Sequence, residues 1–220
     1  MPQVYRSLAL VVGLAALAAS GSSFAQRAQG HVQEVTGNVT GQGSTGRLRG
    51  LGTGQALPHN ATVTTGPQSH AVLRFDDGMA VLLKENTSFQ VQNYTYNPNA
   101  PETANATFHL LRGGLRILTG EMISRNRDTL RVGTPLATIG IRSTEFVAEL
   151  TNSLFVRVIR GVITVTNSAG TVQFRVGEDG AVTSSSTLGR LISMNQIPPG
   201  VFQMPNVSLT PVSGKILPKH

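Results

Sequence analysis

The chain has 220 residues, contains no Cys and no Trp, and carries charge on only 13% of its residues, whereas an ordinary soluble domain has about a quarter. The absence of cysteine excludes a disulfide framework and a thiolate zinc site, and the scarcity of Glu and Lys disfavours helix-rich folds. The formal net charge is +7, and Arg supplies 15 of the 18 basic residues.

Residues 1–25 have the features of a secretory signal peptide. An apolar run of about a dozen residues follows Arg6, and the small residues before Gln26 predict cleavage after Ala25. The run is shorter than the roughly 20 residues that span a bilayer. We therefore expect a periplasmic or secreted protein with no membrane span after signal cleavage.

Residues 26–57 form a Gly-rich segment with one strand pair expected around Val32, Val35 and Val39. The stretch GQGSTG, at residues 41–46, has the glycine spacing of a dinucleotide-binding loop. Neither a helical pattern nor an acidic residue about twenty positions later follows it, so we interpret it as a flexible loop and expect no cofactor.

Residues 58–182 alternate apolar and polar residues in short runs separated by turn signals. The runs are 71–75, 79–83, 89–91, 108–110, 115–117, 130–132, 137–141, 146–150 and 154–158. The turn signals include Asp76-Asp77-Gly78, Gly113-Gly114 and the residues 167–170. We predict an all-β fold of many short strands, each about five residues long, in a solenoid-like, barrel or sandwich arrangement. Residues 94–107 lack the alternation and are expected to form an exposed loop.

Residues 183–220 hold five of the eleven prolines, and they predict an extended C-terminal tail that is either draped on the domain or free. One short helix or strand is expected around residues 188–194.

Candidate catalytic and metal-binding groups are sparse. The five histidines share no ligand spacing, and Asp76-Asp77-Gly78 lacks the further acidic positions of a calcium loop, so a hairpin turn is favoured there. Glu145 and Glu149 are four residues apart and would pair only on a helix, but their surroundings predict a strand. We therefore expect no catalytic, cofactor or metal site and no enzymatic activity.

The arginines between residues 112 and 175 are spread over the expected strands. We interpret them first as solvated strand faces that keep edges from aggregating, and second as a contact for an anionic envelope polymer. Nucleic acid is not expected, because aromatic residues for base stacking are few and the chain is expected to be exported.

The sequence VGTPLATIGIRSTEFVAEL, at residues 132–150, resembles the signature of the FecR-domain family. That signature is Thr-Pro, a small apolar alternation, then Gly-[apolar]-Arg-Gly-Thr-x-Phe. The matching residues are Thr134, Pro135, Gly140, Arg142, Thr144 and Phe146, while Ser143 stands where the family usually has Gly. The resemblance covers residues 58–182 and implies an all-β, solenoid-like fold in a periplasmic or exported domain.

We interpret these signature residues as structural. Pro135 suits the start of a strand, Gly140 permits close backbone approach, and the fork of Arg142 could tie a turn through backbone carbonyls or through Glu145. If the position of Ser143 requires a positive φ, the local turn should differ or loosen.

Regulatory members of the family have a cytoplasmic sigma-factor-regulating domain and a membrane span before this domain, which receives a signal from an outer-membrane receptor. Because this chain begins with a signal segment, we expect a stand-alone exported module without direct control of a sigma factor. The favoured function is non-enzymatic protein interaction or signal sensing with an envelope protein partner, by strand addition. The alternative is an adhesin-like structural protein that binds a cell-envelope or extracellular polymer, and its binding should weaken with salt.

Overall fold

The structure is a computed structural model that describes residues 30–58, 60–125 and 129–210. The predicted signal segment, with its cleavage site at Ala25 and Gln26, lies outside the described residues, as do residues 211–220 of the predicted tail. Within the described part, no helix has the length and apolar character needed to cross a membrane.

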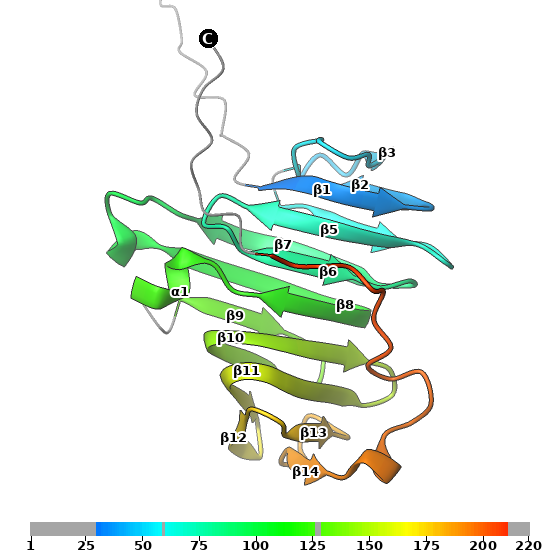
Figure 1. The fold of residues 1–220 in the computed structure, drawn as a ribbon, viewed down its shortest axis with the longest axis vertical. Coiled ribbons are helices and arrows are strands. Elements are labelled where there is room, and N and C mark those ends of the chain that lie inside the picture. Colours follow the sequence, from blue (N-terminus) through cyan, green and yellow to red (C-terminus); the bar gives the residue numbers. More distant parts are fainter. Residues whose placement is uncertain (1–29, 59, 126–128, 211–220) are drawn as a thin grey trace, which may run out of the picture.

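The described chain folds into fourteen strands, one short α-helix and two 3-10 turns, so the prediction of an all-β fold is confirmed (Figure 1). The strands are β1 (Gly30–Thr36), β2 (Val39–Gln42), β3 (Leu48–Gly50), β4 (Thr62–Thr65), β5 (His70–Phe75), β6 (Ala80–Leu83), β7 (Ser88–Thr95), β8 (Asn105–Leu118), β9 (Leu130–Gly133), β10 (Thr138–Leu150), β11 (Leu154–Asn167), β12 (Gly170–Arg175), β13 (Asp179–Val182) and β14 (Arg190–Ile192). The helical elements are η1 (Pro101–Thr103), α1 (Glu121–Arg125) and η2 (Met194–Gln196).

Three long strands bend and so belong to two layers. Layer A pairs β1, β5, β6, the second half of β8, the second half of β10, the first half of β11, β13 and β14. Layer B pairs β3, β2, β4, β7, the first half of β8, β9, the first half of β10, the second half of β11 and β12. All of these pairs are antiparallel except β8 with β9, which is parallel. In layer B, β9 lies between β8 and β10, whereas in layer A β8 and β10 pair directly.

The three strands bend at residues that the sequence pattern either predicts as a turn, as at Gly113-Gly114, or does not mark as a turn at all. Gly113 in β8 has φ +79° and Gly161 in β11 has φ +77°, and β10 shifts register between Arg142 and Glu145. The predictions of a turn at Gly113-Gly114 and of strands about five residues long are therefore wrong for β8, β10 and β11, which have 13 or 14 residues. In β8 and β11 the physical reason is that a glycine with positive φ can kink a continuous strand as readily as it can end one, whereas β10 continues through a register irregularity between Arg142 and Glu145.

Replacing Gly113 with alanine should lower the free energy of unfolding by about 3 kcal/mol, because the change combines positive φ with overpacking. A Cβ there would lie 2.6 Å from Thr87 Cα and 2.8 Å from the Asn86 carbonyl oxygen. Gly50→Ala is the matched control, since a Cβ at Gly50 meets nothing within 4 Å and should cost under about 0.5 kcal/mol. Urea unfolding of both variants measures the difference, and equal losses would refute this account of the bend.

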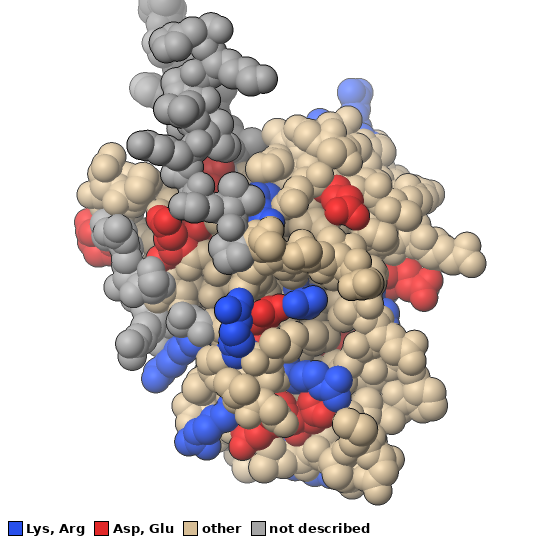
Figure 2. Space-filling view, in the orientation of Figure 1, with Lys and Arg blue, Asp and Glu red and all other residues tan. Residues whose placement is uncertain are grey.

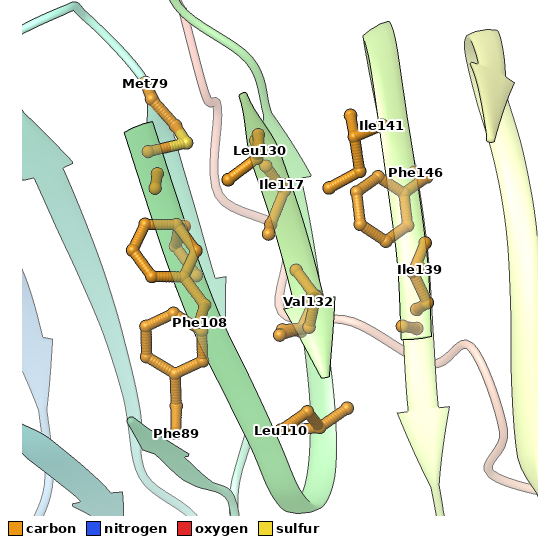
Figure 3. Close-up of a cluster of buried hydrophobic side chains, with 14 of the residues drawn as sticks. Met79, Phe89, Phe108, Leu110, Ile117, Leu130, Val132, Ile139, Ile141 and Phe146 are labelled. Carbon is orange, nitrogen blue, oxygen red and sulfur yellow. The ribbon is translucent and has the colours of Figure 1, made fainter. Parts of the chain in front are cut away.

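The core lies between the layers and is built from the inward-facing residues of both (Figure 3). The ring of Phe108 lies 5.2 Å from those of Phe75 and Phe89, centroid to centroid. Phe146 and Ile139 enter the same core from the two halves of β10, so the bend of that strand serves both layers.

At the N-terminal side, the predicted pairing around Val32, Val35 and Val39 is wrong. β1 pairs with β5 in layer A, and β2 pairs with β3 and β4 in layer B. The strands exist, but the short link between them crosses from one layer to the other and makes no hairpin. Residues 41–46, the loop with dinucleotide-like spacing, form the end of β2 and the turn that leads to β3.

The predicted exposed loop at residues 94–107 is shorter in the structure. β7 continues to Thr95 and β8 begins at Asn105, and Ala104 and Ala106 are buried. The alternation is hard to see there because small and polar residues occupy the strand positions.

The described part of the tail is draped on the domain, which was one of the two alternatives. The short element expected around residues 188–194 is β14. The following residues 197–210, here called the C-terminal strap, run across the outer face of layer A (Figure 1). Met204, Val207 and Leu209 pack on a cluster that includes Val72 and Leu82, while Val201 and Phe202 pack on a second cluster around Phe155.

Candidate functional site

The turn from β9 to β10 is tied by the first signature residue. The Thr134 hydroxyl donates to the Ala137 carbonyl at 2.8 Å and accepts the backbone N–H of Leu136 and of Ala137. Pro135 lies exposed in this turn, just before β10. A hydroxyl that replaces backbone partners in this way fixes a short turn without a glycine.

Thr144 and Phe146 lie at the bend of β10. The buried Thr144 hydroxyl donates to the Arg160 carbonyl, and its backbone N–H donates to Thr119 Oγ1 at 3.0 Å. Phe146 is fully buried in the core. The side chain of Ser143 lies outside the described residues, so its consequence for this turn stays a prediction.

Gly140 and Arg142 instead face the outside of layer B, where they line a shallow groove with a volume of about 320 Å³. The other polar residues of the lining are Arg131 on β9, Thr138 on β10, and Thr164 and Thr166 on β11. The signature is therefore divided between residues that hold a turn or the core and residues that border an open groove.

The carboxylate of Glu145, which the sequence analysis names as a group that Arg142 could bind, is held next to the bend by Arg116 and Arg160. Glu145 is buried on β10, and its Oε1 accepts Nε of Arg116 at 2.8 Å while Oε2 lies 3.2 Å from Arg160. Two arginines from the neighbouring strands β8 and β11 thus neutralise one buried acid.

Two further ion pairs lie along the C-terminal strap. Lys84 donates to Glu149 at 2.8 Å and to the Gly200 carbonyl at 3.1 Å, and the other oxygen of Glu149 accepts the backbone N–H of Phe202. Arg157 forms two hydrogen bonds with Asp179, at 2.7 and 2.8 Å, and its guanidinium lies over the Phe202 ring. Figure 2 shows acidic and basic side chains side by side on this face.

Asp77 is the buried carboxyl in the β5–β6 turn, where the hairpin interpretation of Asp76-Asp77-Gly78 is confirmed. Its Oδ1 accepts the Tyr94 hydroxyl at 2.8 Å and the Met79 backbone N–H at 3.1 Å, while its Oδ2 has no hydrogen-bond partner within residues 30–58, 60–125 and 129–210. Burial raises the pKa of Asp77, and burial together with the Asp77 charge raises the pKa of Tyr94.

We expect Asp77→Asn to gain stability relative to the native chain as the pH rises from 4 to 7. The folded state keeps the Asp77 proton at pH values where the unfolded chain, with its ordinary pKa of 3.8, has released it. The stabilisation from this protonated group is therefore full below that value and is lost as the pH rises through the raised folded pKa. Urea midpoints of both proteins at pH 4 and pH 7 test this, and a difference between them that does not change with pH would contradict it.

The far end of layer B has an open strand edge. Among the strands that the structure describes, β12 pairs with β11 alone, and the two-residue turn at Ser168 and Ala169 sets their register. Two exposed apolar side chains lie next to β12: Val176 directly follows the strand and is 60% exposed, and Leu188, whose Cδ1 would lie 3.3 Å from a Cβ at Gly170, is 45% exposed. The sequence pattern gave no sign of this edge, because a strand's place in a sheet depends on pairing.

Comparison with known proteins adds a family to this geometry. The sequence profile of the FecR protein family matches residues 61–173, which is more than half of the chain. The chain belongs to the FecR family. The assignment indicates a signal-sensing or regulatory module, and the match includes every signature residue from Thr134 to Phe146.

Two solved structures are similar to this FecR-family chain, and no curated protein sequence matches it significantly. Both are crystal structures, at 2.50 and 1.65 Å resolution, of a "putative anti-sigma factor" from Parabacteroides distasonis ATCC 8503. Each has a TM-score of 0.45, with 17% and 16% sequence identity respectively. The similarity covers 60% of this chain and 57% of the Parabacteroides chain.

Proposed function

We propose that this FecR-family chain is an exported, non-enzymatic module that senses a signal by receiving a segment of an envelope protein partner. The partner segment adds as a strand to the open edge of β12. Family membership and the secretory pattern of residues 1–25 support the proposal. The single observation that carries it is the free edge of β12 bordered by exposed apolar side chains.

The register of β12 shows which backbone groups a partner would use. In a hairpin with a two-residue turn, the closing pair Asn167 and Gly170 is hydrogen-bonded, and every second pair after it is too. Thr171 and Gln173 therefore direct their N–H and carbonyl groups away from β11. An added strand gains its affinity from such groups, and apolar neighbours supply pockets for its side chains.

Three carboxylates held in ion pairs support a non-enzymatic role. Glu145, Glu149 and Asp179 are each held by at least one cation from a neighbouring strand. An acid in such a pair stabilises packing and is poorly placed to exchange protons with a substrate.

The proposal is tested by capture of envelope proteins with crosslinker-treated mature chain, comparing Gln173→Pro with Gln173→Ala. Proline removes an outward-facing N–H and blocks strand addition, but it is tolerated at an edge position of this kind. We expect the proline variant to capture at least about tenfold less of the partner than the native chain, and the alanine variant to capture as much as the native chain. Equal capture by the two variants, or no recovered protein, would refute strand addition at β12.

The groove over Gly140 favours a second candidate function, binding of an anionic envelope polymer through Arg131 and Arg142. Polymer binding of this kind should weaken steeply between 50 and 500 mM NaCl, because the Debye length shortens as the salt concentration rises. Strand addition should persist over the same range.

A further inference from the structure

Layers A and B end unevenly beyond β11. Layer A continues through β13 to β14, whereas layer B, among the described strands, ends at β12 (Figure 1). β12 lies over β13, because the Phe174 ring of β12 packs on Gly180: a Cβ at Gly180 would lie 2.3 Å from Phe174 Cε1. A Cβ at Gly189, the residue before β14, would lie 3.6 Å from Phe174 Cζ. Layer B therefore has no described strand in the position opposite β14.

The inner face of β14 is apolar and uncovered. Leu191 pairs with Gly180 of β13, and directly opposite residues of an antiparallel pair point to the same face. Because the Phe174 ring covers Gly180 on the inner face, the Leu191 side chain also points inward. Ile192 points outward, where it packs in the cluster beneath the C-terminal strap. Leu191 is 58% exposed, whereas the inward-facing Val182 of β13 is buried, so Leu191 lacks the covering strand that β13 has.

The neighbouring edge of β12 is apolar on the same side. Val172 and Phe174 point inward, because their partners on β11 lie in the core. Leu188 is 45% exposed, and its Cδ1 would lie 3.3 Å from a Cβ at Gly170, the first residue of β12. We call the exposed side chains of Leu188 and Leu191 the end surface. A strand in the position opposite β14 would lie against this surface and beside β12.

Hydrogen bonds at the end of β12 limit the length of the open edge. Thr171 and Gln173 direct their N–H and carbonyl groups away from β11. The next outward-facing N–H, that of Arg175, donates to the Glu178 carboxylate at 2.6 Å, and the Arg175 carbonyl accepts the Glu178 N–H at 2.9 Å. The open groups are therefore those of Thr171 and Gln173, and a segment of about five residues is long enough to pair with them.

We propose that the position opposite β14 takes a short amphipathic strand of the protein partner, with apolar side chains at alternate residues. The inference rests on the proposed function, because the same edge of β12 holds the strand. Its inward face covers Leu188 and Leu191, and its outward face lies beside Thr171 and Gln173. A charged side chain on the inward face would be buried against leucine without a partner, so the alternation decides which segments are accepted.

The added segment must be free of its own sheet on the inward face. This requirement excludes β12 of a second copy of the chain. In each copy Phe174 holds β13 against β12, so the β13 of the second copy would occupy the place of β14 in the first. An extended segment of another protein meets the requirement.

The first test uses the purified mature chain and a synthetic peptide, Lys-Thr-Val-Thr-Val-Thr-Lys, whose valines alternate with threonines. The comparison peptide carries Glu in place of both valines. Because the chain has no Cys, Leu191→Cys places a single thiol on the end surface, and its rate of reaction with a soluble maleimide reports its exposure. The valine peptide at about 2 mM should slow this reaction at least about threefold, and the glutamate peptide should leave it unchanged.

Leu48→Cys is the matched control, since Leu48 is 65% exposed on β3, at the other end of layer B. Its reaction rate should be the same with and without either peptide. No slowing at Leu191→Cys, equal slowing by the two peptides, or equal slowing at the two thiols would overturn the proposal. A dimer in light scattering that protects the Leu191→Cys thiol without peptide would also overturn it, because the occupant would then be a second copy.

The second test repeats the capture of the envelope partner. Leu191→Asp places a charge beneath the added strand and should capture at least about tenfold less partner than the native chain, whereas Leu48→Asp should stay within about twofold of it. Thermal melting shows that both variants are folded, as expected for changes at exposed positions.

Comparison with Gln173→Pro separates this proposal from the proposed function. Loss of capture in Gln173→Pro with native capture in Leu191→Asp would leave strand addition standing and would overturn the contact with the end surface. Loss in Leu191→Asp with native capture in Gln173→Pro would instead refute strand addition at β12.

Discussion

A chain that ends at Pro199 should lose on the order of 5 kcal/mol of its free energy of unfolding, because it lacks the C-terminal strap beyond that point. β5 and β6 are buried on both faces, and the outer face of Val72, Leu82 and Leu118 is covered by the strap residues Val207 and Leu209. The truncated chain also loses the backbone carbonyl of Thr210 that accepts Arg74, and the two strap groups that satisfy Lys84 and Glu149. Since domains are stable by only about 5–15 kcal/mol, the shortened chain should be close to unfolding at 25 °C.

Because the chain has no Trp, urea unfolding is followed by tyrosine fluorescence or far-ultraviolet circular dichroism, and it measures the loss of unfolding free energy. Gln203→Ala is the control, because Gln203 is an exposed residue of the strap and should change the midpoint little. An unchanged midpoint in the truncated chain would show that the strap lies on layer A without stabilising it.

Glu145→Gln is expected to cost about 3 kcal/mol, the lower part of the range for breaking a buried ion pair. The carboxylate is 8% exposed and binds two arginines, and amide replacement removes the charge while keeping the shape. The loss of stability stays at the lower end of this range because Arg160 is 63% exposed, so water can solvate its guanidinium once the carboxylate is gone. Unfolding in urea at pH 7 gives the value.

The matched control is Glu102→Gln, an exposed carboxylate in η1, which should change stability by less than about 0.5 kcal/mol. If both changes cost the same, the triad of Arg116, Glu145 and Arg160 contributes no more than an ordinary surface charge.

Most strands of this fold were predictable from the sequence, but the lengths of β8, β10 and β11 and the pairing of the strands were not. Alternation of apolar residues correctly marked Leu73 and Phe75, or Phe146 and Ala148, as core positions. The pattern could not show that β8 continues through Gly113, because a glycine of positive φ has the same composition signal in a kink and in a turn. Nor could it pair β1 with β5, since the partner of a strand depends on contacts that are distant in sequence.

The tail and the site show the same limit. Continuous apolar residues in β6 indicate burial on both faces, but a strap without periodicity gives no sign that it covers one of them. The signature drew attention to Gly140 and Arg142, while Arg131 and Thr164 become neighbours of Gly140 only through the order β9, β10 and β11. Glu145 and Arg116 lie 29 residues apart, so their pairing required the fold.

The open edge of β12 and the groove over Gly140 both lie on layer B. The strap and the buried ion pairs lie on layer A, where they keep the rest of the fold closed. A partner can therefore dock on layer B without disturbing the packing of layer A.

The most direct test of partner binding at β12 is amide hydrogen exchange of the mature chain, alone and in complex with its captured partner, in 500 mM NaCl. Strand addition predicts that the outward-facing amides of Thr171 and Gln173 exchange at least about tenfold more slowly in the complex. Unchanged exchange at these two amides, with slowing confined to other strands, would contradict the account.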